Sequence, residues 1–337
     1  MQKLVTALFL AGSLGVSGFS QSNDDLKRVK DIPLPGVAGR FDHFAFDSQR
    51  NIVFAAATGN HSVEVIDTVS GTVKQSISGL GKPHGLAWVP ETGRLFVADG
   101  TLASLNVYEG SPLKLIRSIP LSDDADDMVY DSKMKLLFVG HGGSDGKSPG
   151  RVAIIDAVKL QLLANLPASS HPEALELDPV TDRVFANIAD SAEVLVIDAK
   201  QQRPIATWKL TRAQHNVPAA YDANTGILLL GCRTPAKLLV LDGQTGRELE
   251  DLDSTTGADD LFYDTDNNKA YLITGSGHVD VYRMDANKSL QKERNIETEN
   301  GAKTGLLVPS THTLYVGIPS TTSGPASIRV FATSVSQ

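Results

Sequence analysis

The sequence predicts an all-β fold, a seven-bladed β-propeller of four-stranded antiparallel blades. Three observations predict it. The chain contains seven similar units of 42 to 47 residues, each unit holds short apolar strands separated by Gly, Asp, Asn and Ser turns, and the N-terminal segment matches the one strand that the last unit lacks. Such periodicity in strand-rich sequence is typical of a ring of blades.

Each unit contains an anchor, which is the residue that ends its first strand-like run. A second apolar strand begins about six residues after the anchor, as at residues 95–97 and 314–316, and a third follows, as at residues 194–198. Four strands in some 40 to 45 residues is the size of one propeller blade. The anchors are Asp47, Val89, Asp131, Asp178, Asp222, Asp264 and Val308.

Ring closure is predicted from the two ends of the repeat region. The seventh unit stops after its third strand, near Thr333, whereas residues 26–34 (LKRVKDIPL) match residues 113–121 (LKLIRSIPL), the fourth strand of the second unit. We therefore expect residues 26–34 to form the outer strand of the last blade. Such pairing would close the ring and cover an exposed sheet edge.

Repeated aspartates are interpreted as turn residues. The anchors, and the aspartates that end third strands, recur because Asp accepts hydrogen bonds from turn N–H groups. Cys232 is the only cysteine, which excludes an intramolecular disulfide, and its apolar segment predicts a small buried side chain.

The N-terminus predicts export. Residues 1–20 combine a charged start, an apolar run from Leu4 to Val16 and small residues before Gln21, the pattern of a cleaved signal peptide. The run falls short of the ~20 residues that span a bilayer. We expect a mature chain of residues 21–337, a single propeller domain without membrane insertion, monomeric, and periplasmic or secreted.

Charge argues against a nucleic-acid partner. The formal net charge is −8, and no run of Lys and Arg is present. Nucleic-acid binding requires basic side chains that neutralise phosphates.

Several motifs indicate a family. Residues 93–98 (GRLFVA), 182–187 (DRVFAN) and 193–198 (EVLVID) resemble the YVTN-type repeats of the YncE-like family of exported bacterial propellers. The resemblance covers essentially the whole mature chain. It implies an exported binding or scaffold protein, in a periplasm of the Gram-negative type.

The candidate site follows from the repeat phase. The innermost strand of each blade begins at one face of the ring, here called the top face, so residues at a fixed distance before the anchors surround the mouth of the central channel. Five residues before the anchors lie Asp42, His84, Asp126, Glu173, Val217, Asp259 and Lys303. Four before lie His43, Gly85, Asp127, Ala174, Pro218, Asp260 and Thr304, and the ring seven before includes Arg40, Lys82, Asp124, His171 and His215.

Imidazole and carboxylate thus concentrate at the channel mouth, where ligand sites with convergent polar groups are expected. The candidate ligand-binding residues are His43, His84, Asp126, Asp127, His171, Glu173, His215, Asp259, Asp260 and Lys303. A divalent metal is the one cofactor that these residue types favour, since imidazole suits Zn or Cu and carboxylate suits Ca, Mg or Mn. The candidate metal ligands are His43, His84, His171 and Glu173.

Two functions remain open. The first, which we favour, is a non-enzymatic module that binds a small molecule, a metal or a protein at its top face. The alternative is a metal-assisted enzyme, a lactonase-like hydrolase or a copper oxidoreductase, with a general acid or base among His43, His84, Asp126 and Glu173. The single Gly-x-Ser-x-Gly match, residues 142–146 (GGSDG), lacks the following helical pattern of a nucleophile elbow, and no phosphate-binding loop is present, so no motif specifies a catalytic residue.

Overall fold

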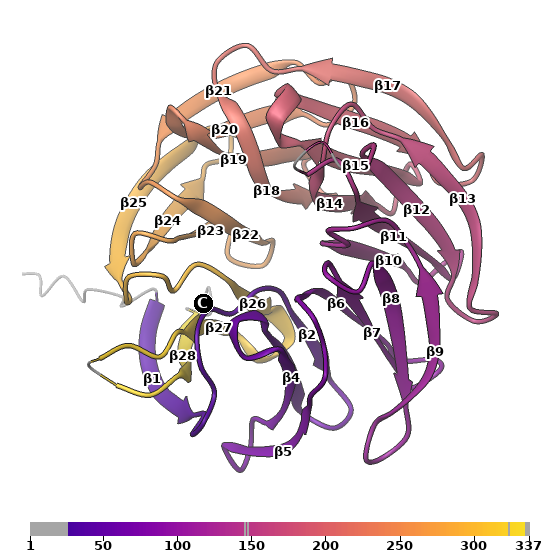
Figure 1. The fold of residues 1–337 in the computed structure, drawn as a ribbon. Coiled ribbons are helices and arrows are strands. Elements are labelled where there is room, and N and C mark those ends of the chain that lie inside the picture. Colours follow the sequence, from indigo (N-terminus) through magenta and orange to yellow (C-terminus); the bar gives the residue numbers. More distant parts are fainter. Residues whose placement is uncertain (1–25, 145, 147, 323, 334–337) are drawn as a thin grey trace, which may run out of the picture.

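Seven four-stranded antiparallel sheets surround a central channel in the computed structural model (Figure 1). The structure describes residues 26–144, 146, 148–322 and 324–333. The predicted fold class, a seven-bladed all-β propeller, is confirmed. The predicted signal peptide lies outside the described residues.

Each of the first six blades is built from four consecutive strands, ordered from the channel outwards. Blade 1 contains β2 (Phe44–Asp47), β3 (Ile52–Ala57), β4 (Ser62–Asp67) and β5 (Thr72–Ile77). Blade 2 contains β6 (Pro83–Val89), β7 (Arg94–Asp99), β8 (Ser104–Glu109) and β9 (Lys114–Pro120). Blade 3 contains β10 (Met128–Asp131), β11 (Leu136–His141), β12 (Arg151–Asp156) and β13 (Gln161–Pro167).

The second half of the ring repeats this order. Blade 4 contains β14 (Pro172–Asp178), β15 (Arg183–Ile188), β16 (Glu193–Asp198) and β17 (Arg203–Lys209). Blade 5 contains β18 (Gln214–Asp222), β19 (Ile227–Thr234), β20 (Ala236–Asp242) and β21 (Glu248–Asp253). Blade 6 contains β22 (Ala258–Asp264), β23 (Lys269–Thr274), β24 (His278–Met284) and β25 (Leu290–Glu297). In the described part of the chain, the short 3-10 turns are Thr58–Asn60, Ala189–Ser191 and Pro309–Thr311.

Blade 7 is assembled from both ends of the repeat region. It contains β26 (Gly305–Val308), β27 (Thr313–Ile318) and β28 (Ser327–Thr333), and β1 (Leu26–Pro33) pairs with β28 as the outer strand. The antiparallel register runs from Leu26 opposite Thr333 to Pro33 opposite Ser327. Figure 1 shows this indigo strand beside the yellow C-terminal strands. The predicted closure by residues 26–34 is confirmed.

The core lies between the blades. Seven apolar clusters each combine side chains of two neighbouring blades. Phe54 of blade 1, for example, stacks on Trp88 of blade 2 with ring centroids 5.2 Å apart. Cys232 is fully buried in the cluster between blades 4 and 5, as its sequence context predicts. The ring therefore closes only if every blade contacts both neighbours.

The anchor aspartates hold turns, as predicted. Oδ1 of Asp47 accepts a hydrogen bond from the N–H of Gln49 at 3.0 Å, and Oδ1 of Asp131 accepts one from Lys133 at 2.8 Å. These bonds satisfy backbone donors at the face opposite the channel mouth.

Bulges at the top of the innermost strands aim polar side chains into the channel. In blade 1, Asp42 and His43 together bond to the single residue Ala56, and in blade 3, Asp126 and Asp127 bond to Gly140. A bulge places two residues opposite one and redirects their side chains. Successive residues can therefore both face the channel, where a regular strand would turn one of them away.

Across the described ranges, no helix has the length and apolarity needed to cross a membrane.

Candidate functional site at the channel mouth

A polar cavity of about 190 Å³ lies at the top-face mouth of the channel and is here called the mouth cavity. Residues from all seven blades line it, most of them within or just before the innermost strands. They are Arg40, Asp42, His43, Lys82, His84, Asp124, Asp126, His171, Glu173, Val217, Arg233, Asp259 and Lys303.

Asp126 is the hub of this cavity. Its Oδ1 atom lies 3.5 Å from Nδ1 of His84 and 4.0 Å from Nε2 of His43, while its Oδ2 atom lies 3.2 Å from Nε2 of His171. Three imidazoles from three other blades thus converge on one carboxylate of blade 3.

His171 is held in one orientation by a backbone contact. Its Nδ1 atom lies 2.7 Å from the carbonyl oxygen of Gly142. Because a carbonyl oxygen can only accept a hydrogen bond, Nδ1 must carry the proton, and Nε2 faces Asp126. Metal-binding histidines commonly have this arrangement, in which the ring nitrogen remote from the metal donates to a carbonyl or a carboxylate.

His43 has the corresponding arrangement in blade 1. Its Nδ1 atom lies 3.3 Å from Oδ1 of Asp260, and its Nε2 atom lies 3.7 Å from Oδ1 of Asp42. One ring nitrogen therefore contacts an acceptor, and the other faces the carboxylates of the mouth cavity.

His84 and Asp42 form a buried pair beside the hub. Nδ1 of His84 lies 2.6 Å from Oδ2 of Asp42, and both residues are about 95% buried. Nε2 of His84 has no hydrogen-bond partner among the described residues and lies 3.8 Å from Oδ1 of Asp124. The pairing holds the pKa of Asp42 well below its ordinary value, because hydrogen bonding and charge from His84 outweigh the effect of burial.

Two groups of the site titrate far from their ordinary range. Burial opposes the charged form of His171, but the hydrogen bond and charge of Asp126 outweigh it and raise the pKa to about 9. Burial, together with the nearby charge of Asp126, raises the pKa of Glu173 to about 7. The carboxylates thus lie close enough together to raise the pKa values of neighbouring groups, which stay protonated at higher pH. Such shifted pKa values are frequent at functional sites.

Basic side chains surround the mouth and pair with some of its carboxylates. Nη1 of Arg40 lies 3.1 Å from Oδ2 of Asp42, and Nζ of Lys82 lies 2.9 Å from Oδ1 of Asp124. Asp259 pairs with both other cations of this rim, Arg233 and Lys303.

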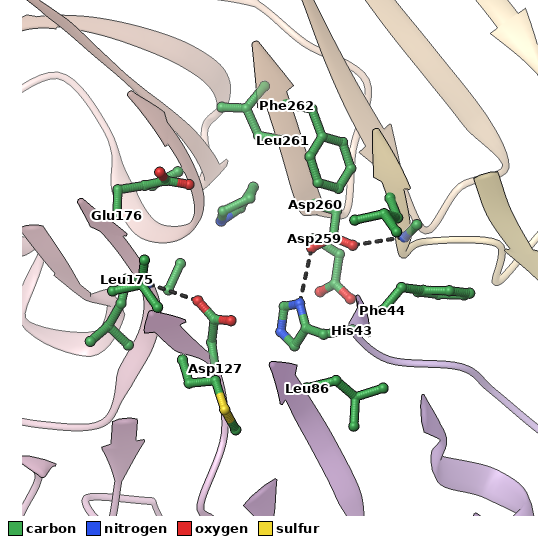
Figure 2. A pocket seen from close by; sticks show the side chains of 17 residues that line it. His43, Phe44, Leu86, Asp127, Leu175, Glu176, Asp259, Asp260, Leu261 and Phe262 are labelled. Atoms are coloured by element: carbon green, nitrogen blue, oxygen red, sulfur yellow. Dashed lines mark hydrogen bonds and ion pairs between the residues drawn. The ribbon is translucent and has the colours of Figure 1, made fainter. Parts of the chain in front are cut away.

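A second cavity of about 200 Å³, the inner cavity, lies further along the channel (Figure 2). His43 and Asp259 line both cavities, so the two are adjacent. The inner cavity is more apolar, but Asp127, Asp260 and Glu176 face it. Burial raises the pKa of Asp127 to about 6, and burial with the charge of Asp127 raises the pKa of Glu176 well above its ordinary value.

Two inner carboxylates support the backbone. Oδ2 of Asp127 accepts a hydrogen bond from the N–H of Leu175 at 2.8 Å, and Oδ2 of Asp260 accepts one from Gly305 at 2.7 Å. These bonds join blade 3 to blade 4 and blade 6 to blade 7. Both aspartates thus have a structural role as well as a place in the cavity wall.

The structure brings nine of the ten sequence candidates to the two cavities. His84, Asp126, His171, Glu173 and Lys303 line the mouth cavity, Asp127 and Asp260 line the inner one, and His43 and Asp259 line both. His215 is the exception, since it lies outside both linings, is half exposed, and has its Nδ1 atom 3.6 Å from Oδ1 of Asp190. Close ligand atoms form two groups, one of Asp126, His171 and Glu173 and one of Asp42, His43 and Asp126. Of the four candidate metal ligands, only His84 belongs to neither group.

The candidate set omitted several residues of the site. Asp42, Arg40, Lys82 and Asp124 lie on the compared rings but were not selected from them. The sequence does contain a signal for Arg233 and Glu176. Arg233 lies eleven residues after its anchor and Glu176 two residues before its anchor, and at each of these positions the other six units have an uncharged residue.

Comparison with known proteins identifies the fold. No family model matches the chain, and no curated protein matches its sequence. A chain in the crystal structure of a mitotic checkpoint complex is similar with a TM-score of 0.77 and 13% identity, over 98% of this chain and 99% of that one. A chain of Kuenenia stuttgartiensis hydrazine synthase has a TM-score of 0.77 and 16% identity, over 89% of this chain and 97% of that one.

At these identities the likeness shows the fold alone, a seven-bladed β-propeller. Function has to be argued from the site.

Proposed function

We propose that this chain is a binding propeller whose channel mouth holds a divalent metal ion between Asp126, His171 and Glu173, here called the His171 trio. One observation carries the proposal. Each member offers a ligand atom, these atoms lie within 4.8 Å of one another, and the far ring nitrogen of His171 donates to Gly142. Mixed imidazole and carboxylate ligands suit Zn²⁺ or Mn²⁺.

Charge in the mouth cavity supports a cation. Five carboxylates and four Lys or Arg side chains line it, and the four basic side chains pair with Asp42, Asp124 and Asp259. Within the described chain, neither Asp126 nor Glu173 has such a salt bridge. Imidazoles are their nearest positive neighbours, with a weaker contribution from the charge of Arg233 at Glu173, and a bound cation would replace the protons that the site now retains.

The unpartnered Nε2 atom of His84 is a second, independent indication that a cation binds in the mouth cavity. His84 is 96% buried, and a buried ring nitrogen without a partner costs free energy unless something binds or screens it. A positive ion among the nearby carboxylates would make neutral His84 the favoured form.

A metal-assisted enzyme is the second candidate, favoured by Glu173. A carboxyl group with a pKa of about 7 can both accept and donate a proton near neutral pH. If Glu173 binds the metal tightly it cannot serve in this way, so the two roles compete. Turnover of a lactone or ester by the metal-loaded protein, abolished by Glu173→Gln, would favour the enzyme.

Elemental analysis tests the binding proposal. The mature protein is purified without a His tag, stripped with a chelator, reloaded with Zn²⁺ or Mn²⁺ and desalted. We expect bound metal in the unaltered protein and in Asp190→Asn, and at least one ion fewer in His171→Ala. Asp190→Asn is a matched control, because Asp190 also lies beside an imidazole but at an exposed place. Unaltered protein that retains no metal would contradict the proposal.

Export and protein partners also belong to the proposal. The signal-peptide pattern and the resemblance to YncE-like propellers support a periplasmic or secreted monomer, and the fold is one that commonly binds other proteins. N-terminal sequencing of the expressed protein is expected to begin near Gln21, and a mature chain that still begins at Met1 would contradict export.

A further inference from the structure

The mouth cavity contains a second set of potential ligands. Asp42, His43 and Asp126, here called the His43 trio, also offer ligand atoms within 4.8 Å of one another. Asp126 belongs to both trios. From this shared carboxylate we infer that the channel mouth is built for two divalent ions bridged by Asp126, a dinuclear centre of the Mn²⁺ or Zn²⁺ class. The inference rests on the proposed function, to which it adds the second ion.

The two oxygens of Asp126 already face opposite trios. Oδ2 lies 3.2 Å from Nε2 of His171, whereas Oδ1 lies 4.0 Å from Nε2 of His43. A carboxylate that presents one oxygen to each of two ions is a bridging ligand, and two-metal sites hold their ions about 3.5 to 4 Å apart. The hub geometry therefore suits a pair of ions better than one ion at the centre of three imidazoles.

Both terminal imidazoles have the same outer support. Nδ1 of His171 donates to the carbonyl of Gly142, and Nδ1 of His43 contacts Asp260, so each ring presents Nε2 to the shared carboxylate. Oxygen or carboxylate partners on the far nitrogen fix a ligating histidine and increase its basicity. The two halves of the centre are thus equivalent in chemistry, although they come from blades 1 and 4.

Asp42 is positioned to bind the second ion through one oxygen. Its Oδ2 atom is held by Nδ1 of His84 at 2.6 Å and by Nη1 of Arg40 at 3.1 Å, while Oδ1 faces His43. His84 and Arg40 are therefore positioning residues, which orient Asp42. Glu173 supplies the corresponding carboxylate to the first ion.

The three ligand carboxylates offset most of the charge of two ions. The ligand carboxylates Asp42, Asp126 and Glu173 contribute three negative charges, against four positive charges of two divalent ions. Release of the imidazole protons accompanies binding. One positive charge remains among the ligand groups, and Arg40 already pairs with Asp42, so the loaded cavity would be positive and suited to hydroxide or to an anionic group of a ligand.

Manganese titration tests the pair. The metal-free mature protein is titrated with Mn²⁺ and its stoichiometry measured, and the loaded protein is examined by electron paramagnetic resonance, which separates exchange-coupled pairs from isolated ions. We expect two ions per chain with a coupled signal. Asp42→Asn is expected to bind one uncoupled ion, and Asp126→Asn to lose the coupled pair. Asp190→Asn is expected to behave like the unaltered protein.

The outcomes separate the two proposals. One ion per chain, or two ions without coupling, would overturn the bridged pair and leave the single-ion function standing. No bound ion would overturn both. Should Asp42→Asn fail to fold, as judged by circular dichroism, Glu173→Gln provides the reciprocal test, because it removes a ligand of the first ion and leaves the His43 trio unaltered.

Discussion

Nε2 of His171 lies 3.2 Å from Oδ2 of Asp126, and this contact joins blade 4 to blade 3 at the channel mouth. Burial lowers the pKa of His171, and this contact is the largest of the effects that raise it. The proposed metal site is built around the same pair, so the pair can be tested before any metal is added.

Substitution of Asp126 should change the titration of His171. In metal-free Asp126→Asn we expect the pKa of His171 to fall from about 9 by roughly 1 to 3, because an opposite charge within a few ångströms has an effect of this size. NMR titration of the imidazole resonances measures it. Asp190→Asn is the control, and an unchanged His171 would show that the contact is absent in solution.

Glu173 should make the metal-free protein less stable as the pH rises. Its folded-state pKa of about 7 lies above the ordinary 4.5, so ionisation costs more in the folded than in the unfolded chain. This cost is absent below pH 4.5, grows between pH 4.5 and 7, and is complete above pH 7. Glu173→Gln should therefore stabilise the metal-free protein at pH 8 by roughly 3 kcal/mol, and leave it little changed at pH 4.

Thermal or urea unfolding at both pH values measures this effect. If Glu173→Gln were equally stable or less stable at pH 8, the crowding of carboxylates around Glu173 would be refuted.

Ring closure should depend on the buried face of β1. Ile32 is 1% exposed in the cluster between blades 7 and 1, whereas Val29 in the same strand is 59% exposed. Ile32→Ala is expected to cost about 2 to 4 kcal/mol of unfolding free energy, and Val29→Ala less than about 0.5 kcal/mol. Equal effects of the two substitutions in urea unfolding would contradict closure by this strand.

Gly85 should control the position of the hub without being a ligand. A Cβ atom at residue 85 would lie 2.2 Å from the backbone oxygen of Asp126, a distance that requires the backbone to move. We expect Gly85→Ala to cost about 1 to 3 kcal/mol and to weaken Mn²⁺ binding at least tenfold. Gly324→Ala is the control, since nothing lies within 4 Å of its added Cβ. Unchanged Mn²⁺ affinity in folded Gly85→Ala would show that binding does not depend on the position of Asp126.

The repeat made most of the fold and much of the site predictable. Anchors such as Asp47 and Asp131 mark turn positions. Residues at a fixed number of positions before each anchor lie near the bulge, where side chains face the channel. His43 and the pair Asp126–Asp127 were found in this way, because bulges let successive side chains point inward, whereas Asp42 lies on the same ring and was not selected.

The remaining features depend on geometry that is not periodic. His215 occupies a ring position, but its backbone is left-handed, with a φ of 52°, and its side chain contacts Asp190 outside both cavities. Arg233 reaches the site from β19, a second strand, so a comparison of innermost strands did not include it. His171 contacts a backbone carbonyl, that of Gly142, and such a contact leaves no signal in the sequence. The sequence therefore could not show which of the ring residues form the metal trios.

Anomalous X-ray diffraction can locate a metal ion at the channel mouth. Crystals of the mature protein, grown without metal and then soaked in Zn²⁺, would be measured on both sides of the zinc absorption edge. We expect an anomalous peak between Asp126, Glu173 and Nε2 of His171. Crystals that bind zinc only elsewhere, or that show no zinc at the channel mouth, would contradict it.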